Sequence, residues 1–293
     1  MNLIFPGGDQ MADVEAQLDD FLKRNSSRRI ALVTSGGTRV PLEKNAVRFI
    51  DNFSMGTRGS ASTEYFLAKG YAVIFFHRDE SLMPFSRKYA RLFENLEVNH
   101  AGQVHVKEMP GLVDAVKAFG QSRDRLFFLP FSDVTRYLST LEKICIRLRP
   151  FGSSVLVYLA AAVSDFYITQ DRLPTHKIHS DEGKLQLTLS IVPKLLDRLV
   201  NELVPEAFVI SFKLETDESV LVEKARGALK KYGHKLVIGN ILQTRKERVI
   251  FVESDREEEI FLSAEQKAEN VEIEQLIVDR LVQIHNHFQS GRH

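Results

Sequence analysis

The feature that most constrains the fold is a short apolar strand followed at once by a glycine pair. Residues 30–34 read Ile-Ala-Leu-Val-Thr, with no alternation of polar and apolar side chains. Such a strand is buried on both faces, as in a parallel sheet that helices cover on each side. Ser35-Gly36-Gly37-Thr38 then breaks it. The pattern predicts the first strand of a layered α/β fold.

A helix and further apolar strands extend this pattern. A helix is predicted from about Arg58 to Lys69, with Gly70 as its C-terminal stop, and residues 71–76 form the next strand. Strand, helix and strand joined by short turns indicate a right-handed βαβ unit. Further buried strands are predicted at 155–159, 207–212 and 236–239. We therefore predict an α/β fold with a doubly wound, Rossmann-like, mostly parallel sheet.

The remaining segments place the boundaries. Residues 1–29 are interpreted as a polar lead-in with one weak amphipathic helix, and residues 30–293 as a single Rossmann-like domain. Residues 166–192 interrupt the pattern as an excursion, or flap, in which 185–190 alternates like a half-exposed strand. Residues 249–252 and 259–262 predict an antiparallel hairpin at one edge of the sheet, and 78–105 shows no regular pattern.

Composition narrows the class of protein. The 39 basic and 39 acidic residues leave no net charge that would favour nucleic acid or an anionic membrane. The single cysteine, Cys145, allows no intrachain disulfide, and no Cys/His cluster suits structural zinc. No apolar run approaches a membrane span, and the acidic N-terminus is unlike a signal peptide. We expect a cytoplasmic protein with no nucleic-acid partner, membrane partner or protein-held metal.

Two glycine-rich turns are candidates for binding phosphate. Gly36-Gly37 would let backbone amides approach an anion, while Gly56 and Gly59 bracket the start of the predicted helix, with the Ser54 hydroxyl beside them. Either turn alone could simply redirect the chain, but both in one βαβ unit favour phosphate binding. Neither a P-loop nor a G-x-G-x-x-G fingerprint is present.

Ligands of an open parallel sheet lie beyond the carboxyl ends of its strands. Asn52 has an amide suited to holding an acyl group, or it could form a turn. Asp165 could bind a substrate or cap a helix. Lys177 could neutralise a phosphate from the flap, or be an ordinary solvated lysine. The other strand-end candidates are Gly36, Ala161, Ala162, Phe212 and Asn240.

An ordered set of segments from about residue 30 to 285 resembles the phosphopantothenate–cysteine ligase family, in its eukaryotic branch. Met55 stands where that family often has serine, although its backbone amide would still serve the cradle. The segments are Val33–Thr38, Val47–Gly59, Tyr158–Phe166, His176-Lys177-Ile178, Ser211–Thr216 and Asn240-Ile241-Leu242.

The resemblance implies a homodimer of Rossmann-like protomers in which the flap takes part in dimerisation. It also implies a reaction that joins 4'-phosphopantothenate to L-cysteine through an acyl-adenylate, with Mg²⁺ and with ATP, which the form of residues 211–216 favours over CTP. By resemblance, Asn52 and Lys177 serve catalysis, and Arg48 reaches the substrate phosphate across the dimer. Nucleotide would contact Gly36, Ser54, Gly56, Gly59, Phe212 and Asn240, and phosphopantothenate would contact Asn52, Ala161, Ala162 and Asp165.

Two alternatives remain at this point. A Rossmann-type NAD(P) oxidoreductase would share the fold, although the dinucleotide fingerprint is missing. A non-catalytic scaffold or regulatory protein could also have kept the fold, although Asn52, Asp165 and Lys177 are all present.

Overall fold

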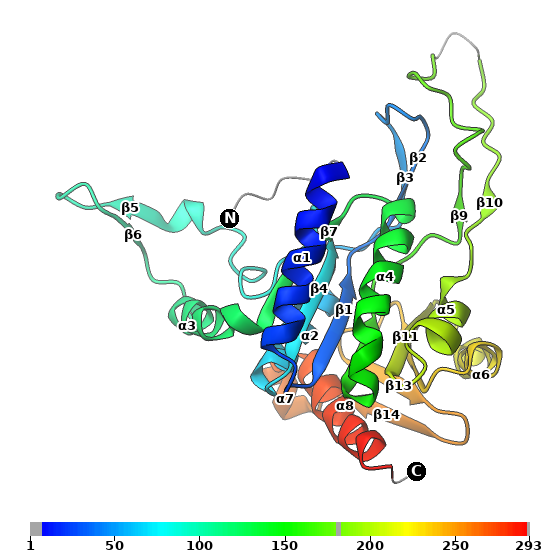
Figure 1. Cartoon of the computed structure of the whole chain (residues 1–293). Helices are drawn as coiled ribbons and strands as arrows, with labels where there is room; N and C mark the ends of the chain where they lie inside the picture. The colour runs from blue at the N-terminus through cyan, green and yellow to red at the C-terminus, as the bar shows by residue number, and fades with distance from the viewer. Residues whose placement is uncertain (1–7, 180–182, 292–293) are drawn as a thin grey trace.

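The computed structural model describes residues 8–179 and 183–291, and an eight-stranded sheet lies at its centre (Figure 1). The strand order is β14-β13-β12-β11-β8-β1-β4-β7. Six strands are parallel, and β13 and β14 run antiparallel at one edge. The strands are β1 (Ile30–Ser35), β4 (Ala72–Arg78), β7 (Leu126–Phe131), β8 (Val155–Leu159), β11 (Phe208–Glu215), β12 (Leu236–Ile241), β13 (Arg248–Val252) and β14 (Glu257–Phe261).

The order of the parallel strands explains where a ligand would bind. The chain runs outward from β1 to β4 and β7, then returns to β8 on the other side of β1 and continues to β11 and β12. This is the doubly wound Rossmann order, whose direction reverses between β1 and β8. The predicted fold class and the edge hairpin are confirmed. The loops that follow β1 and β8 meet at the reversal point.

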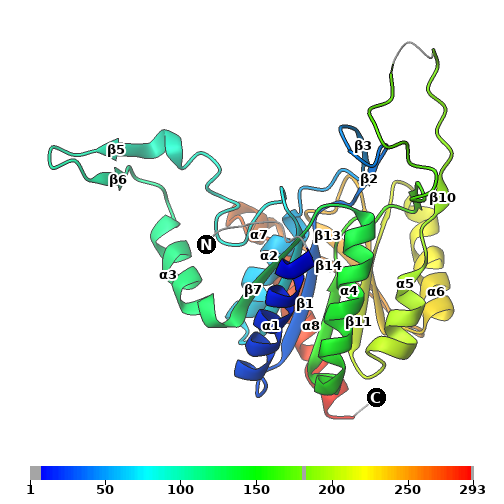
Figure 2. The ribbon, with the colours of Figure 1, turned by 45° about the horizontal axis from the view of Figure 1, so that its top comes forward.

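Helices cover both faces of the sheet, as continuous apolar strands require. One face packs against α1 (Gly8–Arg24), α4 (Val134–Leu148), α5 (Leu195–Arg198) and α6 (Leu221–Tyr232). The other packs against α2 (Thr57–Ala68) and α8 (Ile273–Gln289), and α7 (Ala264–Ala268) is a short helix before α8. Figure 2 shows α1 and α4 on the near face, with α2 and α8 behind the strands. In the part of the chain that is described, no helix is long and apolar enough to cross a membrane.

Two arms project from this body (Figures 1 and 2). The first carries the hairpin of β5 (Leu96–Val98) and β6 (Val104–Val106) and returns through α3 (Leu112–Ser122). The second is the flap, in which β9 (Phe166–Tyr167) pairs with β10 (Ser190–Ile191). A small hairpin of β2 (Arg39–Pro41) and β3 (Phe49–Asp51) lies between β1 and α2.

Two details differ from the sequence-based expectations. The strand predicted at 185–190 is wrong, since only Ser190 belongs to a strand and residues 183–189 have no backbone ladder partner in the described chain. Alternating side chains alone cannot satisfy backbone groups without such a partner. Strand β7 was not predicted. It contains Pro130, and its position at the edge of the sheet makes that proline tolerable.

The helix in the N-terminal lead-in contributes to the core. Phe21 is 2% exposed, and its ring lies 5.5 Å from that of Phe127 on β7. We expect Phe21→Ala to lower the free energy of unfolding by about 3–5 kcal/mol through lost burial and the resulting cavity. Urea unfolding measures this change, with the exposed Gln17→Ala on the same helix as the control. Equal stability of the two variants would contradict the packing of α1.

Candidate functional site

The two predicted phosphate cradles are in direct contact. The Ser35 hydroxyl donates to the Gly56 carbonyl at 3.0 Å, and the Gly37 amide donates to the Ser54 carbonyl at 3.2 Å. A β-carbon on Gly59 would lie 2.5 Å from the Ser35 side chain. The loop after β1 and the turn into α2 therefore form one surface, and glycine is needed where they touch.

Two glycines with left-handed backbone conformations shape this surface. Gly36 and Gly56 have left-handed φ values of 88° and 80°, which glycine adopts without strain. Gly56 is the N-cap of α2, and no side chain caps the helix there. The first-turn amides of α2 are the groups that bind anions at helix N-termini. Ser54 adds a hydroxyl within 3.4 Å of the Gly56 amide.

The loop after β8 closes onto the same surface. The Ala162 amide donates to the Gly36 carbonyl at 2.9 Å, and the Thr38 amide donates to the Ala162 carbonyl at 3.0 Å. The Thr34 hydroxyl accepts from the Ala161 amide at 3.1 Å, and the Thr38 hydroxyl accepts from Ser164 at 2.9 Å. Ala161 and Ala162 thus lie beside Gly36, as strand-end reasoning predicts. Both threonines belong to the Val33–Thr38 segment that carries the family resemblance, but neither was among the predicted site residues.

Asn52 has a fixed backbone, and no described residue makes a hydrogen bond to its side chain. Its amide donates to the Thr38 carbonyl at 3.1 Å, and its own carbonyl oxygen lies 1.6 Å from where a β-carbon on Gly37 would be. Its half-buried side-chain amide has no hydrogen bond to the described residues. The structure therefore places a free donor and acceptor next to both cradles.

Asp165 is exposed at the base of the flap, and Lys177 is exposed further along it. The Asp165 carbonyl accepts from the Val192 amide at 2.9 Å, and strand β9 rather than a helix follows it, so the helix-cap alternative is wrong. The flap rests on residues 42–48: the Lys44 amide donates to the Pro174 carbonyl at 2.8 Å. Lys177 therefore lies on a part of the flap that backbone contacts hold against residues 42–48.

A buried carboxylate fixes Arg48 beside the flap. Glu43 is fully buried and accepts from the Arg48 guanidinium at 2.8 Å, while Arg48 also donates to the Ile178 carbonyl at 3.2 Å. Burial alone would raise the pKa of the Glu43 carboxyl. Hydrogen bonds from Arg48 and from the backbone amides of Val47 and Ile178 outweigh burial and hold that pKa below its ordinary value. Glu43 was not predicted from the sequence.

Phe212 and Asn240 lie on adjacent strands beyond β8. The Phe212 ring packs edge-on against Tyr158 at 4.9 Å. Asn240 is buried, and its side-chain oxygen accepts from Arg58 at 3.0 Å while its nitrogen donates to the Ile238 carbonyl at 3.2 Å. Arg58 also donates to Glu274 at 2.9 Å, so it joins the first turn of α2 to β12 and α8. Arg58 falls within the Val47–Gly59 segment that carries the family resemblance, but it was not among the predicted site residues.

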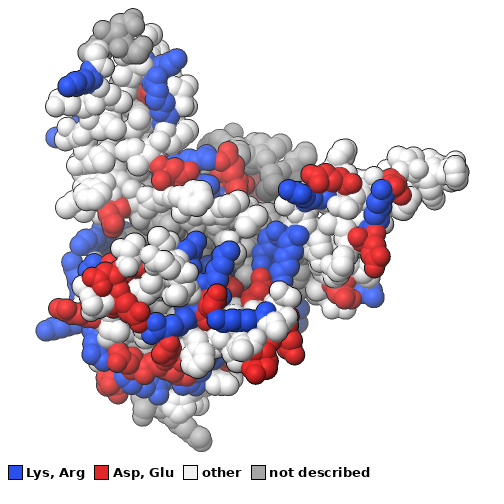
Figure 3. All heavy atoms as spheres, turned by 180° about the vertical axis from the view of Figure 1, so that it is seen from behind, with Lys and Arg blue, Asp and Glu red and all other residues white. Residues whose placement is uncertain are grey.

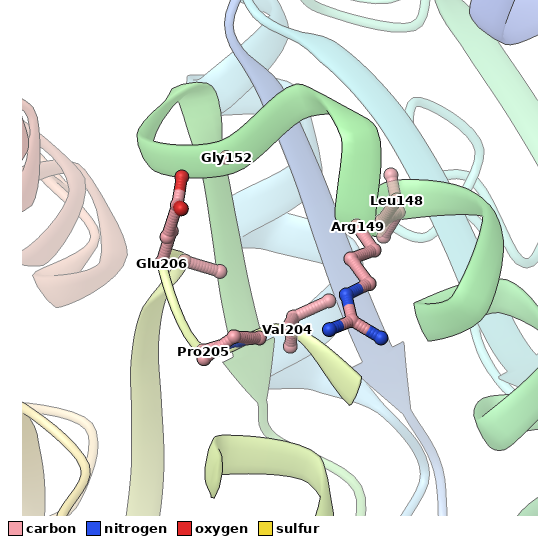
Figure 4. A pocket seen from close by; sticks show the side chains of 7 residues that line it. Leu148, Arg149, Gly152, Val204, Pro205 and Glu206 are labelled. Carbon is pink, nitrogen blue, oxygen red and sulfur yellow. The ribbon is translucent and has the colours of Figure 1, made fainter. Parts of the chain in front are cut away.

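A separate cavity of about 160 Å³ lies at the amino ends of the parallel strands, opposite the carboxyl ends that carry the cradles (Figure 4). Its walls are the residues just before β8 and β11, including Arg149, Gly152 and Glu206. The Glu206 side chain points at the Gly152 turn, where an added β-carbon would lie 2.7 Å from its carboxylate. Because ligands of this fold bind at the carboxyl ends of the strands, we do not assign the candidate site to this cavity.

Comparisons with known proteins identify the family. A family model described as the DNA/pantothenate metabolism flavoprotein C-terminal domain matches residues 141–283. The chain is 43% identical over 272 residues to the phosphopantothenate–cysteine ligase of Mus musculus, covering 89% of this chain and 88% of that one. The chain belongs to the phosphopantothenate–cysteine ligase family, a family of amide-forming ligases.

Other matches in this family cover nearly the whole chain. The phosphopantothenate–cysteine ligase of Homo sapiens is 41% identical over 298 residues, covering 98% of this chain and 96% of that one. A solved structure of a histidine-to-alanine mutant of Cab2 in complex with phosphopantothenate-cysteine superposes with a TM-score of 0.88 at 39% identity, covering 98% and 96%. The family resemblance predicted from the sequence is confirmed, and the NAD(P) oxidoreductase alternative loses its support.

The Glu43 contact predicts a pH-dependent attachment of the flap. Because the pKa of Glu43 is lower in the folded chain than its ordinary 4.5, ionised Glu43 stabilises the contact above that pH, and the stabilisation is lost as pH falls through the folded value. We expect the hydrogen-exchange protection of the Ile178 amide to fall as the solution is acidified below pH 4.5. Glu43→Gln should show low protection at every pH. A pH-independent wild-type protection factor would contradict this role of Glu43.

Proposed function

We propose that this chain catalyses the ATP-dependent ligation of 4'-phosphopantothenate to L-cysteine, giving phosphopantothenoylcysteine, AMP and pyrophosphate in coenzyme A biosynthesis. The observation that carries the proposal is the free Asn52 amide beside two touching glycine cradles, in a chain of the ligase family. The product-like molecule named with the related Cab2 structure supports the same substrate class.

In this proposal the nucleotide lies along the cradles. Backbone amides at Gly36, Gly56 and Gly59 and the Ser54 hydroxyl would bind the phosphates with the help of the α2 dipole. Phe212 and Asn240 would form the wall beyond β8. The Asn240 side chain already accepts a hydrogen bond from Arg58. We therefore propose that Asn240 shapes the wall of the nucleotide site and keeps this hydrogen bond when nucleotide binds.

Phosphopantothenate would lie beside the nucleotide, with Asn52, Ala161, Ala162 and Asp165 around its acyl arm. Lys177 is exposed on the flap and would approach developing negative charge when the flap closes over substrate. The Arg48 side chain is 40% exposed although it pairs with Glu43. Its guanidinium would therefore be accessible to the phosphate of a substrate bound to the neighbouring protomer.

A homodimer is proposed from the resemblance and is supported by apolar surface on both arms. On the flap, Leu185, Leu187, Leu189 and Ile191 are all exposed. On the other arm, the cross-strand pairs Leu96–Val106 and Val98–Val104 share one face of the ribbon. Val98 and Val104 are 69% and 64% exposed. In Figure 3 acidic and basic side chains are intermixed over the body, while the arm tip is mostly uncharged.

The chemistry follows in two steps. The substrate carboxylate attacks the α-phosphorus of ATP, pyrophosphate leaves, and an acyl-adenylate forms. The cysteine amine then attacks the acyl carbon, and AMP departs with the bonding pair. Asn52 would orient the acyl group, and the backbone amides with Lys177 would stabilise developing charge.

Mg²⁺ is proposed as part of the nucleotide substrate. It binds triphosphate oxygens and keeps several waters, so it needs few protein ligands. Among the described residues no three His, Cys, Asp or Glu side chains gather to hold a metal ion.

The cytoplasm remains the proposed compartment. The chain has a single cysteine, Cys145, which is fully buried on α4. A protein without disulfides suits a reducing compartment.

One assay tests the function: purified chain with 4'-phosphopantothenate, cysteine, Mg²⁺ and either ATP or CTP. We expect cysteine-dependent pyrophosphate and AMP, with ATP preferred. Asn52→Ala should lose most turnover while keeping the wild-type melting temperature, because only its side chain faces the site. Asn201→Ala on the exposed part of the 199–203 helix is the matched control.

Other outcomes would overturn parts of the proposal. ADP and phosphate as products would exclude the acyl-adenylate intermediate. A preference for CTP would show that ATP is not the favoured nucleotide. No turnover with either nucleotide would favour the non-catalytic alternative. Wild-type rates in Asn52→Ala would remove Asn52 from the site.

A further inference from the structure

We propose that Arg78 is a positioning residue for Asn52 and acts through Asp51. The inference rests on the proposed function only in that Asn52 is taken to touch the substrate. Arg78 ends strand β4, and its side chain is 11% exposed. One of its terminal nitrogens donates to both Asp51 carboxylate oxygens, at 2.7 and 2.8 Å. Asp51 is the last residue of β3 and directly precedes Asn52.

The contact completes the set of constraints on Asn52. The Thr38 carbonyl accepts from the backbone amide of Asn52, and Gly37 packs against the backbone carbonyl of Asn52. Arg78 fixes Asp51, the residue before Asn52. No described residue holds the Asn52 side chain itself. A residue whose backbone is fixed while its side chain is free is preorganised to meet a ligand. Loss of the Arg78 contact would let the 51–53 segment shift while leaving Asn52 chemically intact.

Arg78 is itself held rigidly. Its carbonyl accepts from the Ser81 amide at 3.0 Å and from the Ser81 hydroxyl at 2.7 Å. The Nδ1 of buried His77 lies 2.8 Å from the same carbonyl and donates to it, because a carbonyl oxygen can only accept. The Arg78 β-carbon lies 2.8 Å from where a β-carbon on Gly36 would be. Arg78 therefore supports the nucleotide cradle and the Asn52 segment together.

The other charges around Asp51 do not replace this contact. Arg39 approaches Asp51 from β2, but its Nε is 3.7 Å away, and it also pairs with Glu80. Asp79 and Glu80 follow Arg78 in the chain, and burial raises the pKa of Asp79. Arg78 is thus the one cation within direct hydrogen-bond distance of the Asp51 carboxylate among the described residues. A planar guanidinium fixes the direction of these bonds in a way that a lysine ammonium does not.

Steady-state kinetics of Arg78→Met, Arg78→Lys, Asp51→Asn and the Arg78→Met/Asp51→Asn double variant test the inference. We expect Arg78→Met and Asp51→Asn each to lower kcat by about 10- to 100-fold through misplacement of Asn52. The KM for ATP should stay within about 2-fold, because every variant keeps the β-carbon of residue 78 that lies beside Gly36 of the cradle. Arg78→Lys should recover only part of kcat. The double variant should be no worse than the single ones, since both remove the same contact.

Lys69→Met is the matched control, because Lys69 pairs with Asp279 at 2.6 Å between α2 and α8, away from the site, and it should keep wild-type kcat. A melting curve for each variant tests whether it is folded. If Arg78→Met is not folded, Arg78→Lys replaces it in the kinetic test. Unchanged kcat in the folded Arg78 variants, or losses that multiply in the double variant, would overturn the inference. A raised KM for ATP at normal kcat would instead make Arg78 a direct nucleotide ligand. A wild-type chain without turnover would count against the proposed function and not against this contact.

Discussion

The whole site depends on backbone contacts that a single β-carbon would prevent. The loop after β1, the turn into α2 and the loop after β8 meet at Gly36-Gly37, and a β-carbon on Gly37 would lie 1.6 Å from the Asn52 carbonyl oxygen. Interiors are packed too densely to absorb such an overlap without moving the backbone. The glycines therefore allow the loops to approach closely, and this approach brings Asn52 beside the loop that follows β1.

Charged residues then fix the segments around this contact. Arg58 joins the first turn of α2 to Asn240 and Glu274. Glu43 accepts hydrogen bonds from Arg48 and from the flap backbone at Ile178. Arg78 donates to Asp51. Each of these pairs connects a loop at the carboxyl edge to a strand, a helix or a second loop. These contacts fix the backbone of the region, while Asp165 and Lys177 are exposed and no described residue makes a hydrogen bond to the Asn52 side chain.

The parts that were predictable from the sequence are those whose signal is local. Continuous apolar runs such as 30–34 predicted buried parallel strands, and the strand ends then placed Gly36, Ala162 and Asn240 at one edge. The pairs Arg58–Glu274 and Arg78–Asp51 were not predictable, because no periodicity links residues so far apart in the chain. The flap strand failed for a related reason: alternation describes side chains, but a strand also needs a ladder partner, and the described chain supplies one for only two residues.

The central claim is that contact at Gly37 sets the geometry of both the cradle and Asn52. The most direct measurement is kcat/KM for ATP of Gly37→Ala, compared with Gly227→Ala, where a β-carbon on α6 has nothing within 4 Å. We expect a loss of about 100-fold or more in a Gly37→Ala protein that circular dichroism shows to be folded, with Gly227→Ala near wild type. A folded Gly37→Ala variant with wild-type kcat/KM would contradict it.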